Sequence, residues 1–134
     1  MTSYVLGFLF NTKGEVVWLI RKSKPNWQKG LLNGIGGKIE QNETSLQAME
    51  REFKEEAGLE IKDWKEFCIL TDEAKGFEVY CFYAFSELTP WTVTEEEVVW
   101  HKTSSIPKDA LSNLNWLIPM ALHSKGFHTK VIYD

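Results

Sequence analysis

Three glutamates on one predicted helical turn are the residues of this chain most able to do chemistry: Glu52, Glu55 and Glu56. Because a helix turns by about 100° per residue, their carboxylates fall on one face. Like charges at these spacings repel by roughly 0.2–0.5 kcal/mol per pair on an exposed helix, and the helix dipole disfavours anions near the C-terminal end. This placement therefore works against local stability unless something compensates for it.

A bound divalent cation would reverse the sign of that repulsion. Hard cations such as Mg²⁺ prefer carboxylate oxygens and keep water molecules and substrate phosphate oxygens as further ligands. Carboxylates with Mg²⁺ can neutralise a diphosphate, polarise its phosphorus and lower the pKa of an attacking water. A solvated acidic face is the usual alternative for a glutamate-rich helix, so the trio alone does not decide between the two.

The residues around the trio match a longer pattern, Gly-x5-Glu-x7-Arg-Glu-U-x-Glu-Glu-x-Gly-U, where U is apolar. Every fixed position is filled over residues 37–59, by Gly37, Glu43, Arg51, Glu52, Phe53, Glu55, Glu56, Gly58 and Leu59. At ordinary residue frequencies the chance of such a match is on the order of one in ten million for this length. The segment resembles the Nudix box, and the rest of the chain is similar to MutT-like Nudix hydrolases over most of its length.

The resemblance implies a fold and a metal. It predicts an α+β fold of the Nudix type, an α/β/α sandwich around a central mixed β-sheet, whose box binds Mg²⁺, with Mn²⁺ as an alternative. The implied metal ligands are the carboxylates of Glu52, Glu55 and Glu56 and the carbonyl oxygen of Gly36. Members of the family differ in their general base, so that role falls to Glu52 or to a carboxylate of a later loop.

The other fixed residues of the box receive supporting roles from the same resemblance. Arg51 and Glu43 resemble a salt-bridged pair that braces the helix, and both are grouped with the catalytic residues. Gly37 and Gly58 would permit tight backbone at either end of the box.

A further acidic ligand often comes from the loop before a strand that ends in tryptophan. Here that loop carries Glu95, Glu96 and Glu97 before Trp100, and alternation does not identify which of them reaches the metal. We select Glu96. The alternative for the other two is an edge charge run that blocks sheet aggregation.

Trp27 and Asn33 are the predicted contacts to a nucleobase. Their segment resembles that of purine-triphosphate sanitising Nudix enzymes, in which an aromatic residue and an asparagine line the base pocket. Ordinary packing of Trp27 and a turn role for Asn33 are the alternatives. Lys22 and Lys24, with Arg21, form the largest basic cluster and are predicted to hold the terminal phosphates, or else to be a solvated strand end.

The start of the last predicted helix departs from the sanitising enzymes, which read an oxidised purine there with a pair of acidic residues. This sequence has Asn113 and Asn115 instead, and we retain Asn113 as a substrate contact because amides both donate and accept. The proline typical of ADP-ribose hydrolases is absent near Ala74, and motifs of NADH and coenzyme A hydrolases are missing. A nucleoside triphosphate with an oxidised or unmodified purine is therefore the favoured substrate.

Composition narrows the class of protein. The 134 residues suffice for one domain, residues 1–134, and the formal net charge of −4 argues against a nucleic-acid partner. No apolar run approaches the ~18 residues of a membrane span. Cys68 and Cys81 lie in apolar strand-like segments and are expected to be reduced core thiols of a cytoplasmic protein. The oligomeric state is not predicted.

Periodicity predicts a helix over residues 45–57, with Thr44 and Gln47 at the spacing of a capping box and Gly58 as its terminating residue. Strands are expected at residues 4–10, 16–20, 64–70, 77–85 and 97–101.

Three less regular segments complete the expected fold. The glycine-rich residues 34–37 are expected to approach a ligand closely rather than to form a strand. A helical turn should follow Pro107. A second helix is expected over residues 115–124, with Pro119 tolerable only in its first turn.

These observations predict a Mg²⁺-dependent hydrolase in which water attacks a phosphorus of a nucleoside triphosphate, releasing the monophosphate and pyrophosphate. A Nudix-fold sensor that binds a nucleotide without hydrolysing it is the first alternative, but such a domain is expected to have lost box glutamates. An RNA-end hydrolase is the second, and the acidic balance counts against it.

Overall fold

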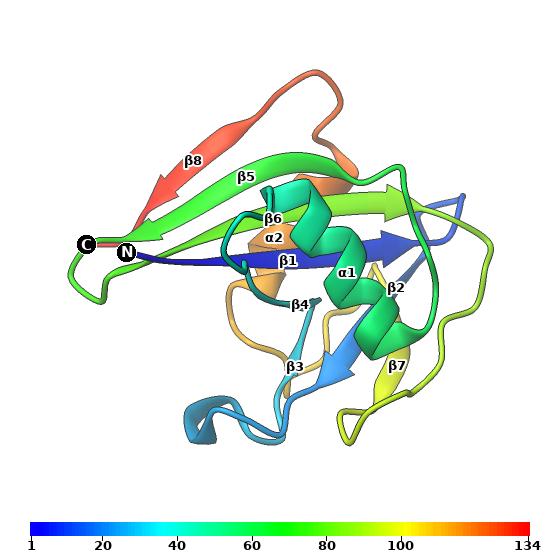
Figure 1. The fold of residues 1–134 in the computed structure, drawn as a ribbon. Coiled ribbons are helices and arrows are strands. Elements are labelled where there is room, and N and C mark those ends of the chain that lie inside the picture. Colours follow the sequence, from blue (N-terminus) through cyan, green and yellow to red (C-terminus); the bar gives the residue numbers. More distant parts are fainter.

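Eight strands form one mixed sheet, and two helices cover it (Figure 1). The computed structural model describes residues 1–134. The strands are β1 Thr2–Phe10, β2 Val16–Arg21, β3 Leu32–Asn33, β4 Ile35–Lys38, β5 Lys65–Asp72, β6 Phe77–Phe85, β7 Val98–Lys102 and β8 Thr129–Ile132. The helices are α1 Ser45–Ala57 and α2 Leu114–Leu122, and a short 3-10 helix, η1, covers Asn26–Gln28.

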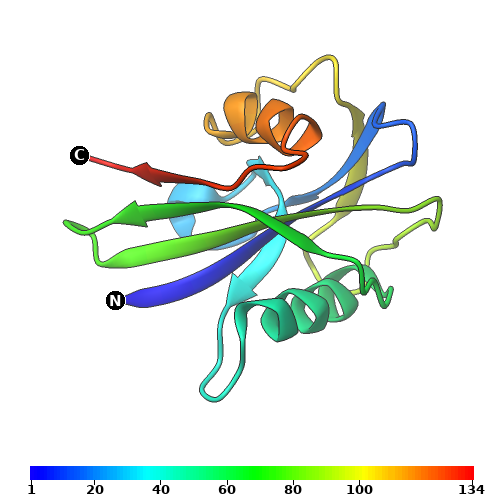
Figure 2. The same cartoon turned by 90° about the horizontal axis from the view of Figure 1, so that it is seen from above.

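The two α-helices lie on opposite faces of the sheet, which Figure 2 shows from above. The buried side chains accordingly form two clusters. The cluster on the α2 face includes Phe8 and Leu117, and the cluster on the α1 face includes Leu9, Met49 and Phe53. The predicted α/β/α sandwich around a mixed sheet is therefore confirmed.

β1 is the strand around which the sheet divides. One edge of β1 pairs in parallel with β6 along its whole length. The other edge is shared, because Tyr4–Gly7 pairs with β4 whereas Leu9 and Phe10 pair with β2. β3 pairs with β2, whereas β4 pairs with β1. The chain therefore passes from the β2 side of the sheet to the β1 side at Gly34, which lies between β3 and β4.

The glycine-rich residues 34–37 contribute a strand, β4, so the prediction against a strand there was wrong. A Cβ atom added to Gly36 would lie 1.9 Å from the carbonyl oxygen of Val5, and one added to Gly37 would lie 2.5 Å from the Glu52 carboxylate. Glycine is needed here because β1 and a side chain of α1 both approach the β4 backbone. Pairing with β1 outweighs the low strand propensity of glycine.

α1 has the predicted bounds and ends. Thr44 Oγ1 accepts a hydrogen bond from the backbone N–H of Gln47 at 3.1 Å, and Gln47 Oε1 accepts one from the Thr44 N–H at 2.9 Å. Gly58 ends the helix in the left-handed conformation, with φ of 79°. The capping box and the terminating glycine are therefore confirmed, and the side chains of Met49 and Phe53 are fully buried.

α2 differs from its predicted form at both ends and at its proline. It covers Leu114–Leu122, not residues 115–124, and Pro119 is its sixth residue, beyond the first turn. Proline cannot donate to the carbonyl of Asn115 four residues earlier. Complete burial of Leu117 and Ile118 against the sheet outweighs the loss of that hydrogen bond.

Long-range pairing explains the remaining differences. The short strands β3 and β8 were not predicted; β8 is held by parallel pairing with β5. A single hydrogen-bonded turn follows Pro107, as predicted, where the Ala110 N–H donates to the Pro107 carbonyl at 3.2 Å. It does not extend into a helix, because the segment runs beside β3, where Leu32 N–H donates to the Asp109 carbonyl at 2.8 Å. Trp64 lies outside β5, and its ring packs against Phe53 with centroids 5.2 Å apart.

Cys68 and Cys81 are free and buried, as expected for core thiols, and they face each other in register between β5 and β6. Neither helix is long and apolar enough to cross a membrane.

Gly58→Ala is expected to destabilise the protein by about 2–4 kcal/mol, from the positive φ and the crowding of a new Cβ. That Cβ would lie 2.2 Å from the Trp91 ring. Gly76→Ala is the matched control, because Gly76 has φ of 74° but no atom within 4 Å of an added Cβ, so only about 1–2 kcal/mol should be lost. Urea unfolding measures both losses, and equal losses would show that Trp91 places no constraint on residue 58.

Candidate active site

Arg51 gathers three carboxylates of the box. Its Nε and Nη2 donate to the two oxygens of Glu43 at 2.6 and 2.9 Å, and its Nη1 donates to Glu52 at 2.9 Å and to Glu55 at 3.3 Å. Nη2 also donates to the carbonyl of Lys38 at 3.1 Å. These bonds tie α1 to β4 and to the loop between them, and the hydrogen bond to Glu43 raises the pKa of Arg51 further above its usual value.

Glu43 forms the loop side of this contact. Its Oε1 also accepts a hydrogen bond from the backbone N–H of Glu40 at 2.9 Å. The hydrogen bond from Arg51 holds the pKa of Glu43 below its ordinary value of 4.5. The fork-shaped pairing of a guanidinium with a carboxylate is strong and directional, so the structure brings the predicted pair together in the geometry of a brace.

Glu52 is buried between α1 and β4. A Cβ at residue 37 would overlap its carboxylate, so the absence of a side chain on Gly37 makes the space that Glu52 occupies. Burial raises the pKa of Glu52, although the hydrogen bond from Arg51 opposes this effect. Glu55, one turn further along α1, is exposed and contacts Arg51 from the solvent side.

Glu56 carries an oxygen with no partner. Its Oε2 is buried and accepts no hydrogen bond. Burial raises the pKa of Glu56 to about 7; Glu96, Glu52 and Glu55 add to the rise, while the positive charge of Lys22 opposes it. A buried carboxylate oxygen without a donor is costly, and a cation is the kind of partner that would satisfy it.

Glu96 reaches the same region from the loop before β7. It is buried, and its oxygens accept hydrogen bonds from the backbone N–H and hydroxyl of Ser23 and from Lys22 Nζ at 3.3 Å. Burial by itself would raise the pKa of Glu96, but the hydrogen bonds from Ser23 and the positive charge of Lys22 outweigh burial, so the pKa is lowered. Glu95 only approaches the Ser23 hydroxyl, at 3.4 Å, so Glu96 is the member of the acidic run that the fold turns inward, next to Glu56.

The residues present fit a divalent cation. No three carboxylates converge on one point, because Arg51 holds Glu52 and Glu55 while Lys22 and Ser23 hold Glu96. The unpartnered oxygen of Glu56 and an all-oxygen donor set are nevertheless what a hard cation requires.

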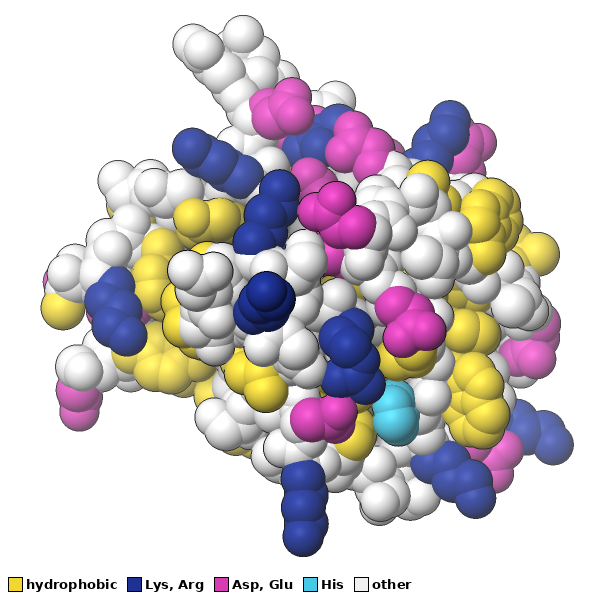
Figure 3. All heavy atoms as spheres, turned by 90° about the horizontal axis from the view of Figure 1, so that it is seen from below, with side chains coloured by type: hydrophobic (Ala, Val, Ile, Leu, Met, Phe, Trp, Pro, Cys, Tyr) yellow, Lys and Arg dark blue, Asp and Glu magenta, His cyan; other side chains and the backbone are white.

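A cavity of about 790 Å³ opens beside these acids on the α2 face of the sheet. Its volume lies in the range of small-molecule sites. Figure 3 shows acidic side chains gathered beside basic ones, next to a surface where apolar side chains are exposed. Gly37 lines the cavity and also touches Glu52, and Lys22 lines it and also binds Glu96. The cavity and the acidic face are therefore continuous.

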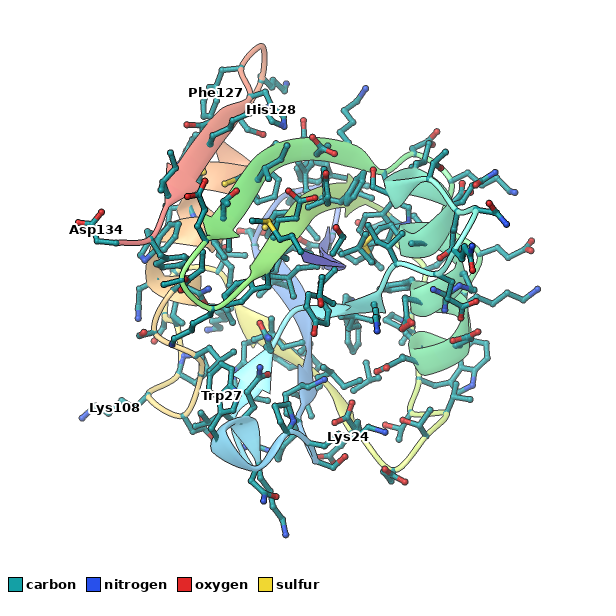
Figure 4. The ribbon with its side chains drawn as sticks, turned by 60° about the vertical axis from the view of Figure 1, so that its left-hand side comes forward. Lys24, Trp27, Lys108, Phe127, His128 and Asp134 are labelled. Carbon is teal, nitrogen blue, oxygen red and sulfur yellow. The ribbon has the colours of Figure 1, made fainter.

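Most of the predicted substrate contacts lie in this cavity, whose walls include Lys22, Trp27, Asn33 and Asn113. Gly36, predicted as a metal ligand, lines it as well. Trp27 extends from η1 and is 69% exposed, so it is an edge of the cavity and not a core residue (Figure 4).

Two of the predicted phosphate contacts lie elsewhere. Lys24 is exposed and does not line the cavity. Arg21 is engaged by Asp109, at 2.9 Å, and by the carbonyl of Gly30. Of the basic cluster, only Lys22 is therefore placed to meet a ligand in the cavity.

The cavity residues that were not predicted include Asp72, Lys75 and Tyr133. Asp72 ends β5 before a turn, a position where aspartate is common for reasons of turn geometry alone. Tyr133 enters because the C-terminal segment returns beside β5, where its N–H donates to the Thr71 carbonyl at 2.8 Å. No local signal identifies either residue as part of a site.

Comparisons with known proteins agree with this fold. A model of the NUDIX domain matches residues 2–128. The chain is similar to a NUDIX hydrolase from Nitrosomonas europaea, with 21% identity, a TM-score of 0.80 and coverage of 99% of this chain and 79% of that one. It is also similar to the mMutator MutT protein from Bacillus halodurans, with 21% identity, a TM-score of 0.77 and coverage of 100% of this chain and 91% of that one. For an ADP-ribose pyrophosphatase from Streptococcus suis the identity is 17% and the TM-score 0.71, with coverage of 97% of this chain and 98% of that one.

Glu43→Gln is expected to cost about 1–3 kcal/mol of stability at pH 7, since it weakens a charge-assisted bond and leaves Arg51 partly unpaired. Because the folded pKa of Glu43 lies below the ordinary 4.5, its contribution is complete above pH 4.5 and is lost as the pH falls through the folded value. Urea unfolding at several pH values should show wild type and variant converging in acid.

Glu50→Gln is the matched control for this measurement, because Glu50 lies on the same helix and forms no ion pair. A Glu43→Gln penalty that stayed constant down to pH 3 would contradict the ion-pair explanation.

Proposed function

The chain belongs to the NUDIX family, whose members include hydrolases of diphosphate bonds, and from this premise we propose that it hydrolyses a purine nucleoside triphosphate to the monophosphate and pyrophosphate with Mg²⁺. One observation carries the proposal. The cavity and the acids share neighbours, because Gly37 and Lys22 both line the cavity while Gly37 lies against Glu52 and Lys22 donates to Glu96. A ligand in the cavity thus extends directly to the glutamates.

The metal would be held by the carboxylates of Glu52, Glu55 and Glu56 and the carbonyl of Gly36, with Glu96 as the ligand from the β7 side. A bound Mg²⁺ would supply charge neutralisation for the diphosphate and a more acidic water. Mn²⁺ has the same preference for oxygen ligands and is the alternative ion. Arg51 and Glu43 keep the loop and helix in register without touching the substrate, so we assign them a positioning role.

Of the two candidates for the general base, Glu52 fits better than Glu96. A base works best when its pKa approaches the operating pH. Burial raises the pKa of Glu52, whereas Ser23 and Lys22 keep that of Glu96 low and occupy its oxygens. Glu52 is therefore assigned to accept the proton of the attacking water.

Lys22 is assigned to the phosphates and Trp27 and Asn33 to the base. Lys22 lines the cavity while its Nζ donates to Glu96 at 3.3 Å, so its positive charge lies between the cavity and the acids, where a phosphate chain would pass. Asn33 Oδ1 is taken by the Gly34 N–H at 2.8 Å, while its amide nitrogen makes only a long contact to Gln28 at 3.4 Å, leaving that donor for a ligand. Trp27 offers an exposed ring on which a flat base can stack.

The proposal extends to the setting of the protein. Its partner is a small-molecule nucleotide, with no nucleic acid or membrane partner. The two free thiols suit a reducing compartment, so we place it in the cytoplasm.

Incubation with a nucleotide panel and Mg²⁺ tests the substrate class. Purine nucleoside triphosphates, oxidised or not, should release pyrophosphate rather than orthophosphate, and should exceed ADP-ribose, NADH and 5′-triphosphate RNA in kcat/KM. Faster turnover of ADP-ribose would replace the proposed substrate. Tight nucleotide binding without any turnover would instead indicate a sensor.

Glu56→Gln tests the role of the acidic face. Loss of this carboxylate should lower kcat about a hundredfold or more, weaken Mg²⁺ binding measured by calorimetry, and leave the fold intact. EDTA should abolish turnover in the wild type. Glu50→Gln, on the same helix but away from the acids, should behave like the wild type. Unchanged rates with Glu56→Gln or with EDTA would refute the assignment.

A further inference from the structure

β8 is an edge strand whose outward backbone groups have no partner. It pairs with β5 alone and stands at one end of the strand order (Figure 1). The Tyr133 N–H donates to the Thr71 carbonyl at 2.8 Å, and the parallel register continues this pattern back along β8. Because the backbone groups of successive residues point to opposite sides of a strand, those of Lys130, Ile132 and Asp134 face away from β5. None of them forms a hydrogen bond within the protein.

The other exposed edges of the sheet are covered by neighbouring segments. On β3, the Leu32 N–H donates to the Asp109 carbonyl at 2.8 Å, and the Leu32 carbonyl accepts from the Leu111 N–H at 2.9 Å. On β7, the outward Val98 N–H donates to the Thr92 hydroxyl at 2.9 Å. Proteins usually block strand edges in this way because unpaired edges recruit other chains. β8 has no such cover, so a further strand can pair with it.

The exposed side chains of β8 are suited to pair with a copy of themselves. Ile132 is 71% exposed, which is unusual for a large aliphatic residue in a strand. Lys130 lies two residues before it and Asp134 two residues after it, so all three project from the same face. Neither charge forms an ion pair within the protein, and Figure 4 shows Asp134 at the outer end of this edge. The order positive, apolar, negative is complementary to itself when two strands run in opposite directions.

We propose that β8 pairs antiparallel with β8 of a second copy of this chain, about a two-fold axis at Ile132. In this register Ile132 lies opposite Ile132 of the second copy, and each Lys130 lies opposite an Asp134. All three residues direct their backbone groups outward, so each opposed pair is of the type that exchanges two hydrogen bonds. Because the same patch is used by both copies, the contact closes as a dimer and does not continue into a fibre.

Charge and burial select this register over its neighbours. An axis at Lys130 would place the two lysines face to face, and an axis at Val131 would place each lysine opposite the apolar Ile132. Like charges directly opposite each other destabilise a strand pair, whereas opposite charges and apolar pairs stabilise it. The axis at Ile132 pairs the apolar side chains with each other and each lysine with an aspartate.

The proposed pairing reaches the rim of the cavity. Val131 and Tyr133 project from the other face of the strand and pack against the core on the α2 side, where Tyr133 lines the cavity. In the proposed register Tyr133 lies opposite Val131 of the second copy, which therefore adds an apolar side chain beside the cavity wall. The axis is perpendicular to the joined sheet, so the cavities of both copies open on the same face.

The strength of the dimer follows from the size of the contact. A few residues of edge strand bury much less than the ~1,600 Å² of a standard interface. We therefore expect a reversible dimer with a Kd of roughly 10–500 μM.

Sedimentation equilibrium of the whole chain at low salt, at concentrations up to about 1 mM, tests the register through its charges. Lys130→Glu places a glutamate opposite Asp134 at both ends of the pair and should raise the dimer Kd about 5- to 30-fold. Combining it with Asp134→Lys restores opposite charges and should return Kd to within about threefold of the wild type. Lys108→Glu is the matched control, because it makes the same change of net charge at an exposed residue away from β8 (Figure 4) and should leave Kd unchanged.

Amide hydrogen exchange followed by NMR identifies the strand that pairs. The amide protons of Lys130 and Ile132 should become protected as the concentration rises, whereas that of Tyr133, already bound to Thr71, should be protected at every concentration. Ile132→Pro removes the central donor at an edge position that proline tolerates, and it should abolish the dimer. Thermal unfolding checks that this variant and the charge variants are folded.

Three results would overturn the proposal. The first is a protein that stays monomeric at about 1 mM, and protection of both amides in such a monomer would assign the edge to another segment of this chain. The second is a dimer whose Kd changes equally, or not at all, in Lys130→Glu and the double variant, because residues 130 and 134 would then not face each other. The third is a dimer in which exchange at Lys130 and Ile132 does not depend on concentration. None of these measurements involves nucleotide turnover, so their outcome is independent of the proposed function.

Discussion

The guanidinium of Arg51 is the constraint on which the acidic face depends. Glutamates on one turn repel each other, and Arg51 offsets this by binding Glu52 and Glu55 while it grips both oxygens of Glu43. The same side chain reaches the carbonyl of Lys38, so β4, the following loop and α1 are held as one unit. A carboxylate cluster can therefore form at the surface and still leave one buried oxygen, on Glu56, without a partner.

The division of the sheet at β1 connects this acidic unit to the cavity. β4 pairs with the first half of β1, and β2 pairs with the end of β1. The chain between β2 and β4 therefore passes from one half of this β1 edge to the other. Only residues without side chains can lie so close to β1 and to Glu52, which explains the glycines at positions 36 and 37 of β4. One side of β4 borders the cavity, and its other side borders the glutamates. The cavity and the acidic residues therefore form one continuous site.

The acidic residues and the cavity lie on different faces of the sheet. The carboxylates belong to α1 and to the loop before β7, whereas the cavity opens on the α2 face. A MutT protein and an ADP-ribose pyrophosphatase have similar folds to this chain at about 20% identity. The shared fold accordingly does not separate substrates, and the distinction must come from the side chains that line the cavity.

The resemblance of the box to a known family implied the pairing of Arg51 with Glu43. The sequence by itself determined the features that depend on local spacing: the pattern of the box, the bounds of α1, its capping box, and the three glutamates on one face. These follow from helical periodicity and short-range contacts. Tertiary structure alone decided which residue of the acidic run turns inward, which member of the basic cluster meets the cavity, and that β4 forms despite its glycines. It also brought Asp72, Tyr133 and Asn113 together, because pairing between strands distant in sequence sets these neighbours, and no local pattern encodes them.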